Sequence, residues 1–258
     1  MTDATARTQT TASEAAAEYA AARARDWQSF TSKVGPLASR WDLWAEESFQ
    51  WRPEISFFQP VGLDYPAFIQ PLRPLLDVLT GMEEIDLPPV PFLHLTTARV
   101  GFMRADDIIW SQVETFYVNA APRLHRIPPF KLRIGGISAR EHELYFGVDD
   151  GHALREVRRQ ISRGVPKVRE RIHEEPVFTA EGDRYVPDVP FAFFTGRGDR
   201  RRVIEAVEPY VDVELGEHDV THVKMGRIAP DPDIHYPDLD VVAEIRLYGE
   251  DYRKGYHN

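Results

Sequence analysis

The chain has no cysteine. This absence excludes disulfide bonds, thiolate catalysis and cysteine-ligated zinc or iron–sulfur centres, and it fits a cytoplasmic protein. Long apolar runs are also missing, because stretches such as Phe191 to Phe194 are far shorter than the roughly 20 residues that cross a bilayer. The first twenty residues lack the basic start and apolar stretch of a secretory signal. The sequence therefore predicts neither export nor contact with a membrane.

Positive charge is comparatively scarce. The 258 residues include 41 Asp and Glu but 31 Lys and Arg, which gives a net charge of −10. A surface of this charge repels a polyphosphate backbone, so long nucleic acid is not expected as a partner. The histidines show no metal-ligand spacing such as His-Glu-x-x-His, and the glycines form neither a Walker loop nor a dinucleotide fingerprint. We therefore expect no metal and no cofactor.

Apolar residues make up 43% of the chain, which is enough for a sizeable core. Short apolar strands alternate with helical stretches, and this order of elements predicts an α+β fold of antiparallel sheets covered by helices. The charged stretch 164–187 is predicted to be irregular, as either a mobile loop or a junction between two lobes. The predicted strands are residues 54–60, 92–102, 130–137, 143–148, 189–195, 211–214, 219–228 and 241–247. The predicted helices are residues 67–79, 105–120, 152–163 and 200–210.

Residues 1–50 form a predicted N-terminal extension, and residues 51–258 form the main domain. Within the extension, residues 1–12 are polar and small, which predicts a disordered tail. Residues 15–24 have the composition of a helix. A second helix is predicted to begin near Pro36, because three apolar residues recur at helical spacing and share one face. These residues are Leu37, Trp41 and Trp44.

The segment 91–102 reads PFLHLTTARVGF and carries the clearest chemical signal. On a strand, His94 and Thr96 project from the same face because side chains alternate with period two. A neutral imidazole can accept a proton from water or a ribose hydroxyl, and an imidazolium can protonate a leaving oxygen. The threonine hydroxyl can donate to a phosphate oxygen. A core histidine beside a strand threonine gives the same pattern, so the pair alone does not establish catalysis.

Residues 92–96, FLHLT, together with residues 100–102 and the helix that follows, resemble the first catalytic motif of the two-histidine (2H) phosphoesterases. This superfamily includes the bacterial 2′,5′ RNA ligase-like proteins. The resemblance implies a bilobal fold in which two antiparallel sheets, flanked by helices, surround a central cleft. It extends over most of the chain after about Trp51, through residues 129–136, 143–148, the helix from His152 and residues 241–247.

In that family, a second His-x-Thr or His-x-Ser lies on a quasi-symmetric strand, and the two histidines act on one phosphate as base and acid. The corresponding stretch here, residues 187–196, reads PDVPFAFFTG. Asp188 replaces the expected histidine, and Pro190 replaces the hydroxyl residue and offers neither a hydroxyl nor an amide donor. A carboxyl group can act as a base, or as an acid when its pKa is raised. The resemblance therefore implies a degenerate site with His94, Thr96 and Asp188 as catalytic candidates across one cleft.

A later strand contains His222 and Lys224, which share one strand face. They are candidate substrate-binding residues if that face reaches the cleft. A half-buried strand histidine is the alternative interpretation for His222.

The resemblance implies a phosphodiesterase-like hydrolase whose partner is a small nucleotide or an RNA end. Two alternatives stay open. The first is a nucleotide-binding protein without turnover, and the second is a recruited enzyme in which the cleft holds another small molecule and His94 acts as a lone acid or base.

Overall fold

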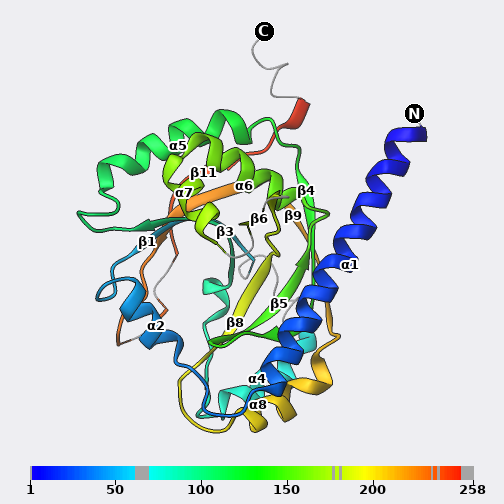
Figure 1. Cartoon of the computed structure of the whole chain (residues 1–258), viewed down its shortest axis with the longest axis vertical. Helices are drawn as coiled ribbons and strands as arrows, with labels where there is room; N and C mark the ends of the chain where they lie inside the picture. Colours follow the sequence, from blue (N-terminus) through cyan, green and yellow to red (C-terminus); the bar gives the residue numbers. More distant parts are fainter. Residues whose placement is uncertain are drawn as a thin grey trace.

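The computed structural model describes residues 2–61, 70–175, 178–179, 182–233, 235–236 and 239–250. Two antiparallel sheets face each other, and helices cover their outer sides (Figure 1). This arrangement confirms the predicted α+β class and the predicted pair of antiparallel sheets. None of the helices in these ranges combines the length and the apolar composition of a membrane span.

The first sheet has the strand order β11-β10-β1-β3, and all of its pairs are antiparallel. Its central strand β1 is buried at every position, because neighbouring strands flank it and side chains cover both faces. The strands of this sheet are β1 (Glu54–Pro60), β3 (His94–Phe102), β10 (His222–Ile228) and β11 (Asp240–Arg246).

The second sheet has the order β2-β8-β5-β4-β9 and is also antiparallel. Apart from the short β2, its strands come from the middle of the chain, whereas the first sheet combines strands from both ends. The strands are β2 (Ile85–Asp86), β4 (Phe130–Ala139), β5 (Glu143–Asp149), β8 (Asp188–Phe194) and β9 (Glu214–Val220). A separate two-stranded pair joins β6 (Phe178–Thr179) to β7 (Gly182–Asp183).

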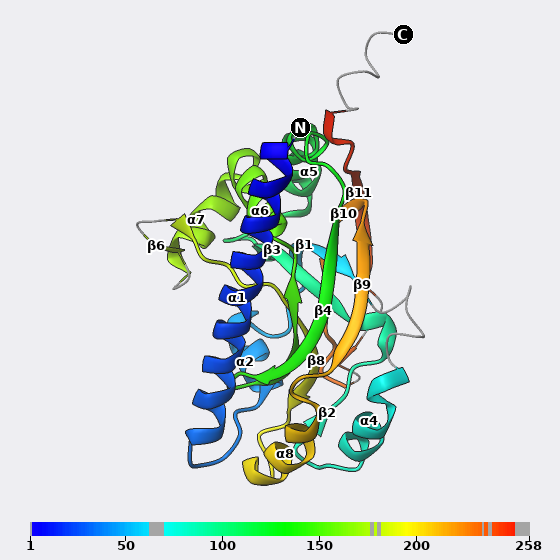
Figure 2. The same cartoon turned by 90° about the vertical axis from the view of Figure 1, so that its right-hand side faces the viewer.

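Helices gather in three places around the sheets. Three of them pack together over the first sheet: α5 (Trp110–Leu124), α6 (Ala153–Gly164) and α7 (Pro166–Glu174). At the opposite end lie α4 (Arg73–Thr80) and α8 (Arg200–Val207) with the 3₁₀ turns η1 (Gln70–Leu72) and η3 (Glu208–Tyr210) (Figure 2). The N-terminal helix α1 (Thr2–Ser32) runs along β4 and β5, and the chain continues into α2 (Arg40–Glu47). A third 3₁₀ turn, η2 (Val90–Phe92), precedes β3.

The N-terminal extension differs from its prediction in two ways. Helix α1 covers the predicted helix 15–24 and also residues 2–12, for which disorder was predicted. Alanine-rich sequence favours continuation of a helix once its C-terminal half is packed against a sheet. Helix α2 begins at Arg40 instead of Pro36, because the Ser39 hydroxyl accepts a hydrogen bond from the Asp42 amide (3.1 Å) and caps the helix there.

The predicted helix 105–120 starts later in the structure, at Trp110. The carboxylate of Asp107 accepts a hydrogen bond from the Phe102 amide (2.8 Å) and binds Arg171 (2.7 Å). These bonds stabilise a turn after β3, so residues 105–109 are not available to a helix.

Helix α7 lies inside the stretch 164–187 that was predicted to be irregular. Pro166 is the first helical residue, where a missing amide hydrogen has no cost. Val168 and Ile172 are four residues apart and are both buried. Two apolar residues in a charged stretch are a weak periodic signal, and for this reason the sequence did not predict the helix.

The strands near the C-terminus were divided differently in the prediction. Residues 208–210, the end of the predicted helix 200–210, form η3. Of the predicted strand 211–214 only Glu214 is in a strand, where β9 begins, and the predicted strand 219–228 is split at Thr221. Before Thr221, β9 pairs with β4 in the second sheet, and after it β10 pairs with β1 in the first. The chain changes sheet at this residue, which a continuous apolar pattern does not reveal. Residues 67–69 of the predicted helix 67–79 lie outside the described residues, and the rest forms η1 and α4.

Candidate functional site

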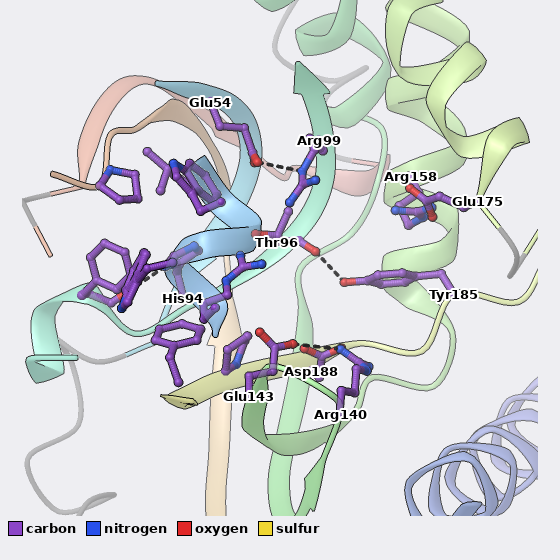
Figure 3. A pocket seen from close by; sticks show the side chains of 18 residues that line it. Glu54, His94, Thr96, Arg99, Arg140, Glu143, Arg158, Glu175, Tyr185 and Asp188 are labelled. Atoms are coloured by element: carbon purple, nitrogen blue, oxygen red, sulfur yellow. Dashed lines mark hydrogen bonds and ion pairs between the residues drawn. The ribbon is translucent and has the colours of Figure 1, made fainter. Parts of the chain in front are cut away.

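A cavity of about 420 Å³ lies between the two sheets. Side chains from both sheets, from α2 and from α6 line it (Figure 3). Its polar lining residues are Arg40, Glu54, His94, Thr96, Arg99, Arg140, Glu143, Arg158, Glu175 and Asp188. Its aromatic and apolar lining residues are Trp41, Trp44, Phe92, Tyr185, Pro190, Phe193, Ile228 and Pro230.

Strand β3 presents His94 and Thr96 to the cavity, while Leu95 between them is buried on the other face. This arrangement follows from the alternation of side chains along a strand. The predicted pairing of imidazole and hydroxyl on one face is therefore present in the structure.

The imidazole of His94 is held in one orientation and one tautomer. Its Nδ1 lies 2.6 Å from the carbonyl oxygen of Phe92, and a carbonyl can only accept, so Nδ1 carries the hydrogen. The rings of Phe58 and Phe92 contact the imidazole edge-on, with centroids 5.7 and 5.3 Å away. Burial lowers the pKa of His94 below its usual value, so the neutral form dominates at neutral pH. Nε2 of this form has a free lone pair, which is the state that a general base requires.

Strand β8 contributes Asp188 and Pro190 to the opposite wall. The Asp188 carboxylate lies 2.7 Å from Nη2 of Arg140, whose Nη1 lies 3.4 Å from Glu143 (Figure 3). Burial raises the pKa of Asp188, although the guanidinium of Arg140 acts in the opposite direction. His94 and Asp188, which were predicted to face one cleft, both line this cavity.

A second polar group lies where α6 meets β3. The Tyr185 hydroxyl donates a hydrogen bond to the Thr96 carbonyl (2.7 Å), and the guanidinium of Arg158 lies 4.3 Å from the Tyr185 ring centroid. Burial raises the pKa of Tyr185 well above its usual value, so the phenol stays neutral. Tyr185 was not among the residues predicted for the site, because most aromatic residues in alternating strands belong to the core.

Arg158 connects three parts of the chain. Its guanidinium donates to the Thr97 carbonyl (2.8 Å) and binds Asp183 (2.8 Å) and Glu175 (2.7 Å), and its side chain is 3% exposed. Removal of one partner from a buried ionic network leaves uncompensated charge, which costs about 3–5 kcal/mol.

We therefore expect Arg158→Met to lower the free energy of unfolding by about 3–5 kcal/mol in urea denaturation followed by circular dichroism. The matched control is Arg159→Met, because Arg159 is the next residue of α6, is 57% exposed and pairs with Glu156 on the surface. The control is expected to change stability by no more than about 0.5 kcal/mol. Equal effects of the two substitutions would show that the buried network does not stabilise the fold.

Glu54 of β1 is a buried carboxylate on the first-sheet wall. Nε of Arg99 lies 2.7 Å from it, and the Ser56 hydroxyl also donates to it (Figure 3). Arg99 has a second, longer ion pair with Glu47 of α2 (3.5 Å). The negative charge of Glu54 is thus compensated within the wall.

Helix α2 forms a wall of the cavity with Arg40, Trp41 and Trp44. Trp41 is fixed by a hydrogen bond from its Nε1 to Asp86 of β2 (2.7 Å) and by stacking on the His235 ring (4.5 Å between centroids). The sequence had predicted an apolar face on this helix, but its purpose was not readable. The two tryptophans on one face of this short helix were the feature of the sequence that indicated a covering role, and in the structure the helix covers the cavity.

The two predicted substrate-binding residues, His222 and Lys224, are not among the residues that line the cavity. Strand β10 reaches the cavity at Ile228, whereas Lys224 lies opposite Phe58 of β1, which in turn lies opposite Thr96 of β3. Lys224 forms an ion pair with Glu244 (2.9 Å), and Nδ1 of His222 lies 2.9 Å from the Thr221 hydroxyl. Sharing a strand face did not bring them to the cavity, because β1 lies between this part of β10 and the cavity-lining residues of β3.

Within the described residues, no cluster of three or more His, Asp or Glu side chains is arranged to hold a metal ion.

No protein-family model matches the sequence, and no curated protein matches it. Among solved structures, TT0787 of Thermus thermophilus is 19% identical, with a TM-score of 0.50 over 77% of this chain and 99% of TT0787. A phosphoesterase is 14% identical with a TM-score of 0.49, over 75% of this chain and 98% of its own. LigT of E. coli, complexed with ATP, is 14% identical with a TM-score of 0.48, over 76% of this chain and 98% of LigT. The chain thus has the fold of TT0787.

Proposed function

We propose that the protein hydrolyses a phosphodiester of a small nucleotide or an RNA end in the cavity between its two sheets, with His94 as general base and Asp188 as general acid. One observation carries the proposal. An imidazole whose tautomer is fixed with Nε2 unprotonated lines the same cavity as a carboxyl group that is 14% exposed and whose pKa is raised.

The two shifts suit a pair of opposite roles. A base must be unprotonated and an acid protonated at the same pH, and burial favours the uncharged form of both groups. With a 2′,3′-cyclic phosphate as substrate, His94 takes a proton from the attacking water while the water oxygen bonds to phosphorus. The bond from phosphorus to one ribose oxygen breaks, and that oxygen receives the proton of Asp188. The product is a phosphomonoester, and solvent returns the proton from His94 to Asp188.

The rest of the lining fits a nucleotide. The Thr96 hydroxyl can donate to a nonbridging phosphate oxygen. Trp44, Phe193 and Tyr185 provide aromatic surface on which a base or ribose can pack. Such a division into a charged and an aromatic part is typical of sites for small phosphorylated ligands.

A nucleotide-binding protein without turnover is the second candidate, and one observation favours it. The Asp188 carboxylate is ion-paired with Arg140 at 2.7 Å, and this guanidinium opposes protonation. If Asp188 stays ionised, the cavity lacks an acid and can bind a phosphate but not cleave its ester.

The test is incubation of the purified protein with 2′,3′-cyclic nucleotides and short 2′,5′-linked oligonucleotides, with products followed by ³¹P NMR and chromatography. We expect conversion of a cyclic nucleotide to a phosphomonoester. Binding without conversion would favour the second candidate. Absence of both would exclude a nucleotide ligand and leave a recruited enzyme that acts on another small molecule.

A further inference from the structure

The four arginines that line the cavity differ in their partners. Arg99, Arg140 and Arg158 each have a carboxylate oxygen at 2.7 Å. Arg40 has no carboxylate partner among the described residues, and its buried Nε has no hydrogen-bond partner there. Arg40 therefore provides a positive charge that has no ion-pair partner among the described residues.

Aromatic rings hold the Arg40 side chain in place. Its Cζ lies 5.5 Å from the centroid of Trp44, one helical turn further along α2, and 5.7 Å from that of Phe193 on β8. Cation–π contacts orient a guanidinium but contribute less than an ion pair with good geometry. The hydrogen-bond donors of the Arg40 guanidinium are thus largely available for a ligand.

The helix that carries Arg40 is itself anchored on both sides of the cavity. Ser39 caps its N-terminus, and Trp41 is bonded to Asp86 of the second sheet. Glu47 at its other end pairs with Arg99 of the first sheet. A guanidinium on a fixed helix is preorganised for a ligand, because little conformational entropy remains to be lost on binding.

Arg40 lies on the side of the cavity that lacks a hydroxyl donor for phosphate. Pro190 on β8 cannot donate to a phosphate oxygen, so the β8 side of the cavity has lost its hydroxyl donor. Arg40 contacts Phe193 of the same strand. Its charge also contributes, after burial, to the lowered pKa of His94, so the two groups interact electrostatically.

We infer that Arg40 binds the phosphate of the ligand from the β8 side, and that helix α2 of the N-terminal extension thereby determines specificity for phosphorylated ligands. This inference rests on the proposed function. The ligand class is a small molecule with a phosphate group next to an aromatic or ribose moiety. The inference assigns recognition of its phosphate to helix α2, which lies outside the two sheets. Bidentate contact with two phosphate oxygens is the geometry that a guanidinium favours.

The test compares binding of adenosine 3′-monophosphate with binding of adenosine by isothermal titration calorimetry. The monophosphate carries the charge but no diester, so it is not consumed during the titration. We expect the protein to prefer the monophosphate, and Arg40→Gln to weaken binding of the monophosphate by roughly tenfold to a hundredfold while leaving adenosine binding unchanged. Arg40→Lys keeps the positive charge but loses the bidentate geometry of the guanidinium. Its affinity for the monophosphate is expected to lie between those of the parent protein and Arg40→Gln.

Arg201→Gln is the matched control, because Arg201 lies in the first turn of α8 as Arg40 does in α2 but is exposed and outside the cavity. It should leave both affinities unchanged. If the parent protein prefers the monophosphate and Arg40→Gln keeps that preference, the role of Arg40 is wrong while the proposed function stands. If the parent protein shows no preference for the monophosphate, the proposed function fails and the role of Arg40 fails with it. Should Arg40→Gln not fold, the same comparison with Arg40→Lys decides.

Discussion

Replacement of His94 by glutamine is expected to lower kcat for a 2′,3′-cyclic nucleotide by about 10²–10⁴-fold, the usual contribution of a positioned general base. The glutamine amide can still donate to the Phe92 carbonyl that now holds Nδ1. It cannot accept a proton from water, so the substitution removes the base with little change in shape. Initial rates at saturating substrate are the measurement.

The pH dependence gives a second readout of the same residue. The pKa of His94 lies below its usual value of 6.5, so the neutral base persists into mildly acidic solution. Activity that depends on this base is lost as the pH falls through the lowered pKa, and His94→Gln should abolish this acid limb. His173→Gln, on the exposed side of α7, is the control and should keep both rate and profile. A variant at position 94 with the parent rate would remove His94 from the mechanism.

The sequence was sufficient to predict which side chains of β3 share the face that lines the cavity. An alternating strand pattern fixes which side chains share a face, and His94 and Thr96 lie together for this local reason. The strand that contains Asp188 was predicted from the same kind of strand pattern. That both strands meet at one cavity came from the resemblance, since no local pattern determines which strands of different sheets face each other.

The parts that were missed depend on contacts between residues far apart in the chain. Arg40 belongs to the site because α2 is anchored to Asp86 of β2, and the sequence gives no sign of that bond. His222 and Lys224 do not line the cavity, because strand periodicity gives the face of β10 but not its place in the sheet, where β1 lies between β10 and β3. Helix α7 was missed because Val168 and Ile172 are its two buried apolar residues in a strongly charged segment.

Asp188→Asn is expected to lower kcat by about 10²-fold or more, because asparagine keeps the shape of the carboxyl group but cannot give a proton to the leaving ribose oxygen. Arg140 retains Glu143 at 3.4 Å and Asp26 at 3.5 Å, so the variant should still fold, and a thermal melt checks this. Asp26→Asn is the matched control, because it removes another carboxylate beside Arg140 that does not line the cavity, while leaving the proposed acid in place. It is expected to retain most of the activity.

The pH profile decides whether Asp188 is an acid or a structural partner of Arg140. Burial raises its pKa above the usual 3.8, so the protonated form persists to higher pH and is lost as the pH rises through the raised value. The pKa of the base His94 is shifted in the opposite direction, so the two shifts together increase the fraction of protein in which His94 is unprotonated while Asp188 is protonated. We therefore expect a bell-shaped profile whose acid limb follows His94 and whose alkaline limb follows Asp188, and Asp188→Asn should remove the alkaline limb. An unchanged alkaline limb in this variant would mean that Asp188 stays ionised against Arg140, and the cavity would then bind a phosphate ester without an acid to cleave it.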